Sequence, residues 1–395
     1  MRIAFYGGSF DPPHRGHVEA ARLAAETLKA DRFLVIPDHD PPHKELDEGS
    51  PSPEERFALC RLAFAGIPGV EVSDLELRRA GKSYTADTVE QLLAENPGAE
   101  LTLVLGEDML RCFEDWYRWR YLLASCDLAV LPRPEGDGEA LRELRGRYER
   151  DCGARVRILP FEPLDVSSRE IRELLPRRQG AELLPDEVYA EIIRRRFYGA
   201  QPELSWLRER VYDRYLKESR IAHVAGCETE AVRLALLWGE DAELAAEAAV
   251  LHDITKRLSV EEQLNLCEKY AIIEHHAAVK YPAVLHAATG AVLAREEFGV
   301  SDEVFGAIRW HTTGRPDMTL LEKIVYLADA IEPTRSYPSV DRLRALADRD
   351  LDAAVLATME RTLEHIRARG QEPCPDTAAA AAWYEQRLKQ EGQTC

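Results

Sequence analysis

The sequence lacks a basic excess, a long apolar run and closely spaced cysteines, and each absence excludes a class of protein. Its 51 Lys and Arg residues are outnumbered by 70 Asp and Glu residues, so the net charge is −19. Both halves of the chain, divided after Ala200, are acidic. Because binding along a nucleic-acid backbone depends on Lys and Arg, we expect no nucleic-acid partner. Any phosphate chemistry must use helix ends, a few cations or bound metal ions.

The longest apolar segments are too short for export or for a membrane. The apolar start of the chain reaches glycine at Gly7, and the Ala-rich stretch 377–383 lies beside charged residues. Neither has the length of a signal-peptide core or a membrane span. The eight cysteines include no Cys-x-x-Cys pair, which is typical of reduced, mostly buried thiols. We therefore predict a cytoplasmic protein without a membrane partner.

The hydrophobic pattern changes once, near residues 198–203, and a length of 395 residues allows two domains at about 100–200 residues each. Before the change, apolar strands alternate with helices, which predicts a doubly wound parallel sheet of the α/β class, similar to a Rossmann fold. The expected strands or extended segments are 2–6, 33–36, 70–77, 101–105, 128–131 and 156–159, and the expected helices are 18–28, 56–65 and 83–96. We assign this domain to residues 1–199.

After the change, helical periodicity with short Gly/Pro connections predicts an all-α bundle over residues 203–395. The expected helices are 204–219, 229–237, 241–251, 260–270, 286–298, 302–311, 320–330, 340–346 and 351–370.

The best-defined motif of the first half is the string GGSFDPPHRGH at residues 7–17, between a strand and a helix. Glycines at such a junction let backbone N–H groups approach a phosphate, and the helix N-terminus adds a favourable dipole. His14 and His17 are three residues apart, so they project to one side if both lie in the first turn. Two imidazoles there can donate hydrogen bonds to phosphate oxygens as charge develops.

This string resembles the HxGH signature of nucleotidyltransferases, and further segments resemble motifs of the bacterial nicotinate-nucleotide adenylyltransferase family. The segments are PPHK at 41–44, SYTADT at 83–88, GEDML at 106–110 followed by Phe113 and Trp116, and SSREIR at 167–172. The resemblance implies transfer of AMP from ATP, bound with Mg²⁺, to nicotinate mononucleotide, with release of pyrophosphate. Such a reaction needs positioning and charge stabilisation rather than a covalent nucleophile.

The resemblance also implies roles for individual residues of the first half. It implies that five residues surround the ATP phosphates: His14, His17, Lys44, Ser168 and Arg172. All of them except Ser168 are expected to be catalytic. The other nucleotide-binding residues are Gly7, Gly8, Ser9, Phe10, Gly106, Asp108 at the ribose, and Ser167. The nicotinate mononucleotide is expected at Lys44, Thr85, Trp116, Tyr117 and Arg133, where Glu135 replaces a glycine of the family pattern.

Without the resemblance, several of these residues have plainer interpretations. Ser167 and Ser168 then form an ordinary N-cap beside a solvated Arg172. Asp108 is a loop carboxylate, and Trp116 belongs to the packing.

Histidines and acids carry the chemistry of the second half. The candidate metal ligands are His223, His252, Asp253, His286, His311 and Asp329. Imidazole and carboxylate donors on several helices suit Fe, Mn or Zn rather than Ca²⁺. A single histidine on an apolar helix would be interpreted as a core residue, but six such residues in this order predict a metal site.

The segments around these ligands resemble the HD superfamily of metal-dependent phosphohydrolases, and within it the bacterial symmetrical bis(5′-nucleosyl)-tetraphosphatases. They are LHDITK at 251–256, HAATGA at 286–291, HTTGR at 311–315 and YLADAIEPTR at 326–335. The resemblance implies two divalent metals, as iron, bridged by Asp253, and hydrolysis of diadenosine tetraphosphate to two ADP. The cations available for the polyphosphate are Lys256, which is expected to be catalytic, Arg315 and Arg335. Without the resemblance, each of them would be interpreted as a solvated charge.

Other interpretations remain open from the sequence. The first half could serve pantetheine phosphate or a flavin, with an HD half that acts on other nucleotides. Alternatively, the HD half could be a regulatory module that binds a nucleotide without turnover. His275 and His276 are expected in a surface or capping role, as are His39, His43 and His365, and homo-oligomerisation is left open.

Overall fold

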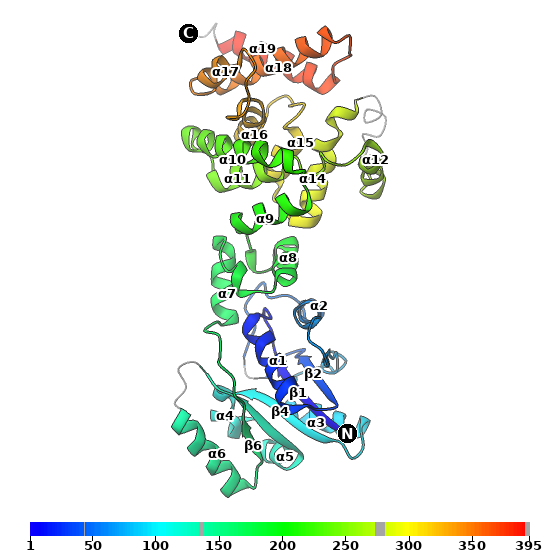
Figure 1. Cartoon of the computed structure of the whole chain (residues 1–395), viewed down its shortest axis with the longest axis vertical. Helices are drawn as coiled ribbons and strands as arrows, with labels where there is room; N and C mark the ends of the chain where they lie inside the picture. The colour runs from blue at the N-terminus through cyan, green and yellow to red at the C-terminus, as the bar shows by residue number, and fades with distance from the viewer. Residues whose placement is uncertain (43, 134–137, 273–280, 392–395) are drawn as a thin grey trace. The chain divides into compact units, whose positions relative to one another are not determined.

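A computed structural model of the chain describes residues 1–42, 44–133, 138–272 and 281–391. The chain divides into two compact units, residues 1–201 and 202–395 (Figure 1). Among the described residues, no helix combines the length and the apolar character that crossing a bilayer requires.

The first unit is built on a six-stranded parallel sheet, which confirms the predicted fold class of this half. The strands are β1 (Arg2–Gly8), β2 (Arg32–Pro37), β3 (Val70–Val72), β4 (Glu100–Gly106), β5 (Cys126–Leu131) and β6 (Val156–Ile158). Their order in the sheet is β3-β2-β1-β4-β5-β6. The direction of winding therefore reverses between β1 and β4, and in open α/β sheets ligands bind at the carboxyl ends of the strands on either side of such a point.

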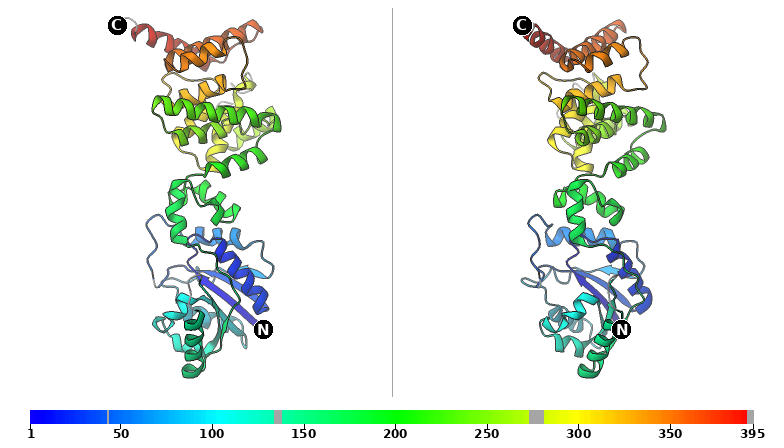
Figure 2. Two further views of the ribbon diagram at one scale, coloured as in Figure 1. Left: turned by 60° about the vertical axis from the view of Figure 1, so that its left-hand side comes forward. Right: turned by 90° about the vertical axis from the view of Figure 1, so that its left-hand side faces the viewer.

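Helices cover both faces of this sheet (Figures 1 and 2). On one face α1 (Arg15–Leu28) and α2 (Pro53–Phe64) pack against the central strands. The other face buries a continuous apolar cluster under helices α3 (Thr85–Glu95), α4 (Glu107–Arg111), α5 (Trp119–Ser125) and α6 (Gly138–Cys152). The unit continues through α7 (Ser168–Leu174) and α8 (Asp186–Arg195), with short 3₁₀ turns at Phe113–Asp115, Leu175–Arg177, Ala181–Leu183 and Phe197–Gly199.

Several elements of this half differ from the expectations, and helices α4, α5 and α8 were not expected. Helix α1 begins at Arg15, three residues before the expected start at 18, so His14 becomes its N-cap. The segment expected to be extended at 70–77 forms a strand only at Val70–Val72, because backbone hydrogen bonds turn the chain at residues 74–79. Helix α6 was not predicted at all, because only two of its side chains, Leu141 and Tyr148, are buried and the apolar period is weak.

The second unit is entirely helical among the residues that the structure describes, as predicted. Its helices are α9 (Leu204–Arg214), α10 (Glu218–Trp238), α11 (Ala242–Leu251), α12 (Val260–Lys269), α14 (Leu285–Phe298), α15 (Asp302–Trp310), α16 (Leu320–Ile331), α17 (Val340–Ala347), α18 (Leu351–Ala368) and α19 (Pro375–Glu391), with a 3₁₀ turn at Pro282–Val284. One apolar core connects most of them, and α10, α11 and α16 form its centre.

The prediction of one helix over 204–219 is wrong. Helix α9 ends at Arg214, the side chain of Leu216 is buried in the connection, and α10 begins at Glu218. Helix α10 then continues to Trp238 and ends at Gly239, whose φ of +79° suits glycine. His223 therefore lies in the second turn of a long central helix. Helix α19 was missed because its Ala-rich sequence carries little periodic signal.

A buried ion pair fixes the loop that follows β1. Arg56, on α2, is fully buried, and its Nη1 donates to the carbonyl oxygen of Ser9 at 2.6 Å and to Asp38 Oδ1 at 2.9 Å. The hydroxyl of Ser9 donates to the other oxygen of Asp38 at 2.8 Å. The carboxyl ends of β1 and β2 are thereby held to α2.

We predict that Arg56→Ala destabilises the first unit by about 3–5 kcal/mol, because it leaves the carboxylate of Asp38 buried without a counter-charge. Hydrogen exchange of peptides from β1 and β2, measured against denaturant in the full chain, reports this free energy. The matched control is Arg32→Ala, which breaks an exposed pair with Glu71 and should cost about 0–1 kcal/mol. Equal losses in the two variants would contradict the assignment.

Candidate functional site

The first unit gathers its predicted phosphate-binding residues at the reversal of the sheet. Gly7 and Gly8 end β1, and Gly106 ends β4, the neighbouring parallel strand. The carboxyl ends of β1 and β4 therefore lie at the same edge of the sheet, where the loop 9–14 leads into α1. Phe10 closes the turn with its ring edge-on to that of His17, with the ring centroids 5.0 Å apart.

His14 and His17 form a stacked pair in the first turn of α1. Their ring centroids lie 3.7 Å apart. The backbone N–H of His14 donates to His17 Nδ1 at 3.3 Å, so a neutral His17 carries its proton on Nε2. The buried Nδ1 of His14 has no hydrogen-bond partner among the described residues. A Cβ at Gly16 would lie 3.1 Å from the His14 ring, so a larger residue at this position would crowd that ring.

Both imidazoles are neutral at physiological pH. Burial lowers the pKa of His14 to about 4, and the charge of Arg133 acts in the same direction. Burial also holds the pKa of His17 well below its ordinary value, with further contributions from His14, Arg133 and Lys44. The pair can therefore donate hydrogen bonds to an anion without first being protonated.

Helix α7 brings Ser167, Ser168 and Arg172 to the same loop. The Ser167 hydroxyl accepts the backbone N–H of Glu170 at 3.1 Å as an N-cap, and the Ser168 hydroxyl donates to the carbonyl oxygen of Pro12 at 2.9 Å. Arg172 Nη1 donates to the carbonyl oxygen of Asp11 at 2.7 Å. These contacts join the end of the sheet domain to the loop before α1.

Two carboxylates that sequence reasoning did not assign, Asp47 and Asp11, form ion pairs with Arg172. Asp47 accepts from Arg172 Nε at 3.0 Å and from Nη2 at 2.6 Å. The buried Asp11 accepts from Tyr198 at 2.8 Å and from Ser50 at 2.9 Å. Asp11 lies inside the recognised string, whereas nothing in the sequence singled out Tyr198, which is 187 residues away.

Asp108 and Arg133 face each other after β4 and β5. The guanidinium of Arg133 donates to the two oxygens of Asp108 at 3.2 and 2.8 Å. Its backbone N–H donates to the buried Glu107 at 3.2 Å. Asp108, which is expected at the ribose, thus forms an ion pair with Arg133, which is expected at the mononucleotide.

The residues expected to hold the pyridine ring lie beside α3. Thr85 is the first residue of that helix, and the preceding Tyr84 packs against Tyr117 with ring centroids 4.7 Å apart. Trp116 packs on Phe113 at 5.0 Å, and half of Tyr117 is exposed. Lys44 is exposed in the loop that follows residue 43.

The second unit brings all six predicted metal ligands together. They come from α10 (His223), the end of α11 (His252 and Asp253), α14 (His286), the end of α15 (His311) and α16 (Asp329). His252, Asp253 and His311 form one group whose ligand atoms lie within 4.8 Å of one another. A second group joins His223, His252 and Asp329 with Cys227.

Asp253 is buried between the two sets of imidazoles. Its Oδ1 lies 3.4 Å from His286 Nε2 and 3.9 Å from His311 Nε2. Its Oδ2 lies 3.5 Å from His252 Nε2 and 3.9 Å from His223 Nε2. One carboxylate oxygen thus faces each set, as a bridging ligand requires.

Hydrogen bonds at Nδ1 orient three of the four rings. Nδ1 of His252 donates to the carbonyl oxygen of Ala249 at 2.6 Å, and Nδ1 of His311 donates to that of Ile308 at 2.7 Å. Nδ1 of His223 lies 3.1 Å from the carboxylate of Glu332. Each neutral ring then presents an Nε2 lone pair, which is the arrangement that metal-ligating histidines adopt.

These donors fit a divalent cation. The buried Nε2 of His252 has no hydrogen-bond partner among the described residues, and such an unsatisfied acceptor is costly. Burial lowers the pKa of His252 to about 3 and that of His311 to about 4. Both rings are therefore neutral and able to coordinate.

Three groups next to the ligands were not assigned from the sequence. Glu332 lies in the recognised segment 326–335, but its contact with His223 spans 109 residues. A Cβ at Gly226 would lie 2.6 Å from a Glu332 oxygen, so the glycine leaves room for this carboxylate. Arg220 pairs with Asp253, and Cys227 follows His223 by one helical turn. The position of Cys227 four residues after His223 was the one sequence signal that could have placed it beside this ligand.

Of the three cations expected to bind the polyphosphate, two contact candidate metal ligands and one does not. Lys256 Nζ lies 3.0 Å from His286 Nε2, and burial lowers its pKa to about 8. Arg335 pairs with Asp329 at 2.7 Å. Arg315 instead pairs with the buried Glu322 of α16 at 3.0 Å, so its guanidinium is held by a carboxylate outside the ligand set.

Some sequence expectations fall outside the described residues. His43, Glu135, His275, His276 and Cys395 lie there. The seven cysteines that the structure describes form no disulfide with one another, and five of them are buried.

Two family profiles match the chain, one in each half. The cytidylyltransferase-like profile covers residues 5–174, and the HD domain profile covers residues 220–334.

Similar proteins divide in the same way. A probable nicotinate-nucleotide adenylyltransferase of Symbiobacterium thermophilum is 38% identical over 201 residues, which are 50% of this chain and 95% of that protein. The symmetrical bis(5′-nucleosyl)-tetraphosphatase of Bacillus subtilis is 39% identical over 169 residues, which are 42% of this chain and 90% of that protein. A crystal structure described as a predicted HD superfamily hydrolase involved in NAD metabolism, from Clostridium acetobutylicum, is 35% identical. It covers 46% of this chain and 97% of its own, with a TM-score of 0.45.

The two sets of matches cover separate halves, and each extends over nearly the whole of its relative. The chain therefore belongs to the nicotinate-nucleotide adenylyltransferase family through its first half and to the HD-domain family of symmetrical bis(5′-nucleosyl)-tetraphosphatases through its second half.

Proposed function

We propose that the chain is a bifunctional enzyme of the cytoplasm with one active site in each unit. The first unit transfers AMP from ATP, bound with Mg²⁺, to nicotinate mononucleotide and releases pyrophosphate. The second hydrolyses diadenosine tetraphosphate symmetrically to two ADP at two iron ions. The observation that carries the first activity is the neutral His14–His17 pair at the start of α1, and the Asp253 cluster carries the second.

In the first unit the residues act by holding phosphate oxygens. The N–H groups of α1 and the Nε2 proton of His17 donate to the oxygens around the reacting phosphorus, where charge develops in the transition state. Arg172, fixed by Asp11, and Lys44 add positive charge. Thr85, Tyr117 and Trp116, which packs on Phe113, would hold the pyridine ring. The Asp108–Arg133 pair would open toward the nucleotide sugar. The carboxylate and phosphate of the mononucleotide fit this mixed aromatic and cationic lining.

In the second unit the imidazoles and carboxylates would hold the metal pair. His223, His252 and Asp329 form one set, His286 and His311 the other, and Asp253 lies between them. When bound, two such cations lower the pKa of a water molecule and neutralise phosphate charge. Lys256 and Arg335 lie next to the ligands and would bind the outer phosphates. Arg220, now paired with Asp253, would exchange that carboxylate for a phosphate oxygen.

The two activities should be separable by single substitutions in the full chain. Asp253→Asn removes the bridging charge and should abolish ADP release from diadenosine tetraphosphate, while formation of nicotinate adenine dinucleotide continues at the wild-type rate. His17→Ala should have the opposite effect, with a loss of about 10²–10³ in the transfer rate. Chromatographic product analysis with each substrate checks both variants. Undiminished hydrolysis by Asp253→Asn, or undiminished transfer by His17→Ala, would refute the corresponding assignment.

Removing the carboxylate that occupies Arg172 should tighten ATP binding. In Asp47→Ala we expect the KM for ATP to fall about two- to fivefold at unchanged kcat, since an exposed ion pair with a guanidinium is worth about 0.5–1 kcal/mol. Steady-state kinetics at varied ATP measures this effect. Asp74→Ala is the control, because Asp74 pairs with Arg78, an arginine to which no role in ATP binding is assigned. An unchanged KM in Asp47→Ala would show that Arg172 does not bind ATP.

The lowered pKa of His14 should make the first unit sensitive to acid. A histidine with a folded pKa of about 4 takes up its proton first in the unfolded chain, whose ordinary value is 6.5. Stability present above pH 6.5 is therefore lost as the pH falls from 6.5 toward 4, by about 2 kcal/mol at about pH 5. Denaturant-dependent hydrogen exchange at about pH 7.5 and about pH 5 measures the loss, which His14→Gln should reduce. An equal loss in that variant would contradict the assignment.

A further inference from the structure

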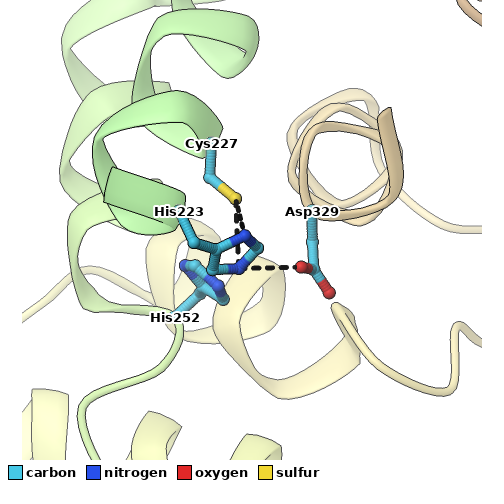
Figure 3. Close-up of side chains that lie close together, drawn as sticks. All are labelled: His223, Cys227, His252 and Asp329. Atoms are coloured by element: carbon cyan, nitrogen blue, oxygen red, sulfur yellow. Dashed lines mark hydrogen bonds and ion pairs between the residues drawn. The ribbon is translucent and has the colours of Figure 1, made fainter. Parts of the chain in front are cut away.

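A thiol lies next to one of the two proposed metal positions, against the His223 ring, with its sulfur 3.8 Å from Nδ1 of that ring. Cys227 lies on α10 one turn after His223, and its Sγ is 3.5 Å from His223 Nε2 (Figure 3). Its sulfur belongs to the group of four side chains whose ligand atoms all lie within 4.8 Å of one another, with His223, His252 and Asp329. The residue is buried, with 1% of its surface exposed.

The surroundings of this sulfur differ from those of a thiol that only fills a gap in a core. His252 is almost completely buried, its Nδ1 is engaged by Ala249, and its Nε2 has no hydrogen-bond partner in the described part of the chain. On the other side, Asp329 Oδ1 lies 3.1 Å from His223 Nε2. A nitrogen lone pair without a partner, a carboxylate and a sulfur thus lie around His223 (Figure 3), with all these atoms within 4.8 Å of one another. Such a donor set is suited to a cation.

The other half of the cluster has no sulfur. Within the described residues, His286 and His311 face the Oδ1 side of Asp253, and the donors around them are nitrogen and oxygen. The two proposed metal positions therefore differ in chemistry: one is lined by nitrogen, oxygen and sulfur, the other by nitrogen and oxygen.

We propose that Cys227 is a metal ligand, the seventh donor of the centre, and that it binds the cation held by His223, His252 and Asp329. This proposal rests on the metal site of the proposed function. As the sulfur–metal bond forms, the S–H bond breaks and the proton leaves to solvent. A thiolate is a soft ligand, so this position selects Fe²⁺, Zn²⁺ or Co²⁺ over Mg²⁺ or Mn²⁺, whereas the position at His286 and His311 is less selective.

Cobalt spectroscopy of the full chain tests the ligand directly. In the wild type loaded with Co²⁺ we expect a near-ultraviolet band from charge transfer between thiolate and cobalt. Cys227→Ser should lose this band, and Cys227→Val should release one of the two cobalt ions to a competing chelator at least about tenfold more readily. The control is Cys267→Ser, because Cys267 is another buried thiol of the same unit in a separate apolar cluster with Leu285.

The outcomes separate this proposal from the function on which it rests. If the wild type binds cobalt and hydrolyses diadenosine tetraphosphate but shows no thiolate band, the ligand assignment fails and the proposed function stands. The same holds if the band persists in Cys227→Ser. If the wild type binds no cobalt, both proposals fail. Circular dichroism verifies that the variants are folded, and Cys227→Ala replaces any variant that is not.

Discussion

The second unit depends on a constraint at the Nδ1 atoms of its histidines. Backbone carbonyl oxygens accept from Nδ1 of His252 and His311, and Glu332 holds Nδ1 of His223. His252 and His311, which burial keeps neutral, must then present their Nε2 lone pairs toward Asp253. Lone pairs and carboxylate oxygens that meet in a buried space repel one another and lack the water that would solvate them. A divalent cation removes both costs, so the helix ends that fix these rings also prepare a metal site.

The first unit handles charge in a different way. Its binding edge is created by the reversal of strand order between β1 and β4. Its loops are held by the ion pairs of Arg56 with Asp38 and of Arg172 with Asp11. His14 and His17 are kept neutral by burial. An acidic chain with a net charge of −19 can in this way bind anionic nucleotides at focused sites, with N–H groups and a few cations instead of a basic surface.

The sequence was sufficient for the fold class and the two families, because these depend on periodic apolar residues and on short motifs. It was not sufficient for features that depend on contacts between distant segments. The break between α9 and α10 depends on the burial of Leu216 against other helices, which no local pattern records. The contact of Tyr198 with Asp11 and that of Glu332 with His223 each span more than a hundred residues. The roles of the individual site residues stay predictions.

The central claim is that the buried donors around Asp253 hold a pair of divalent cations. Elemental analysis of the purified full chain by mass spectrometry, after removal of loosely bound ions, counts them directly. Our account predicts about two divalent ions per chain, with iron among them, and a clear reduction when Asp253 is replaced by Asn. A folded wild-type chain that retains no divalent ion, even after incubation with Fe²⁺, Zn²⁺ or Mn²⁺, would contradict it.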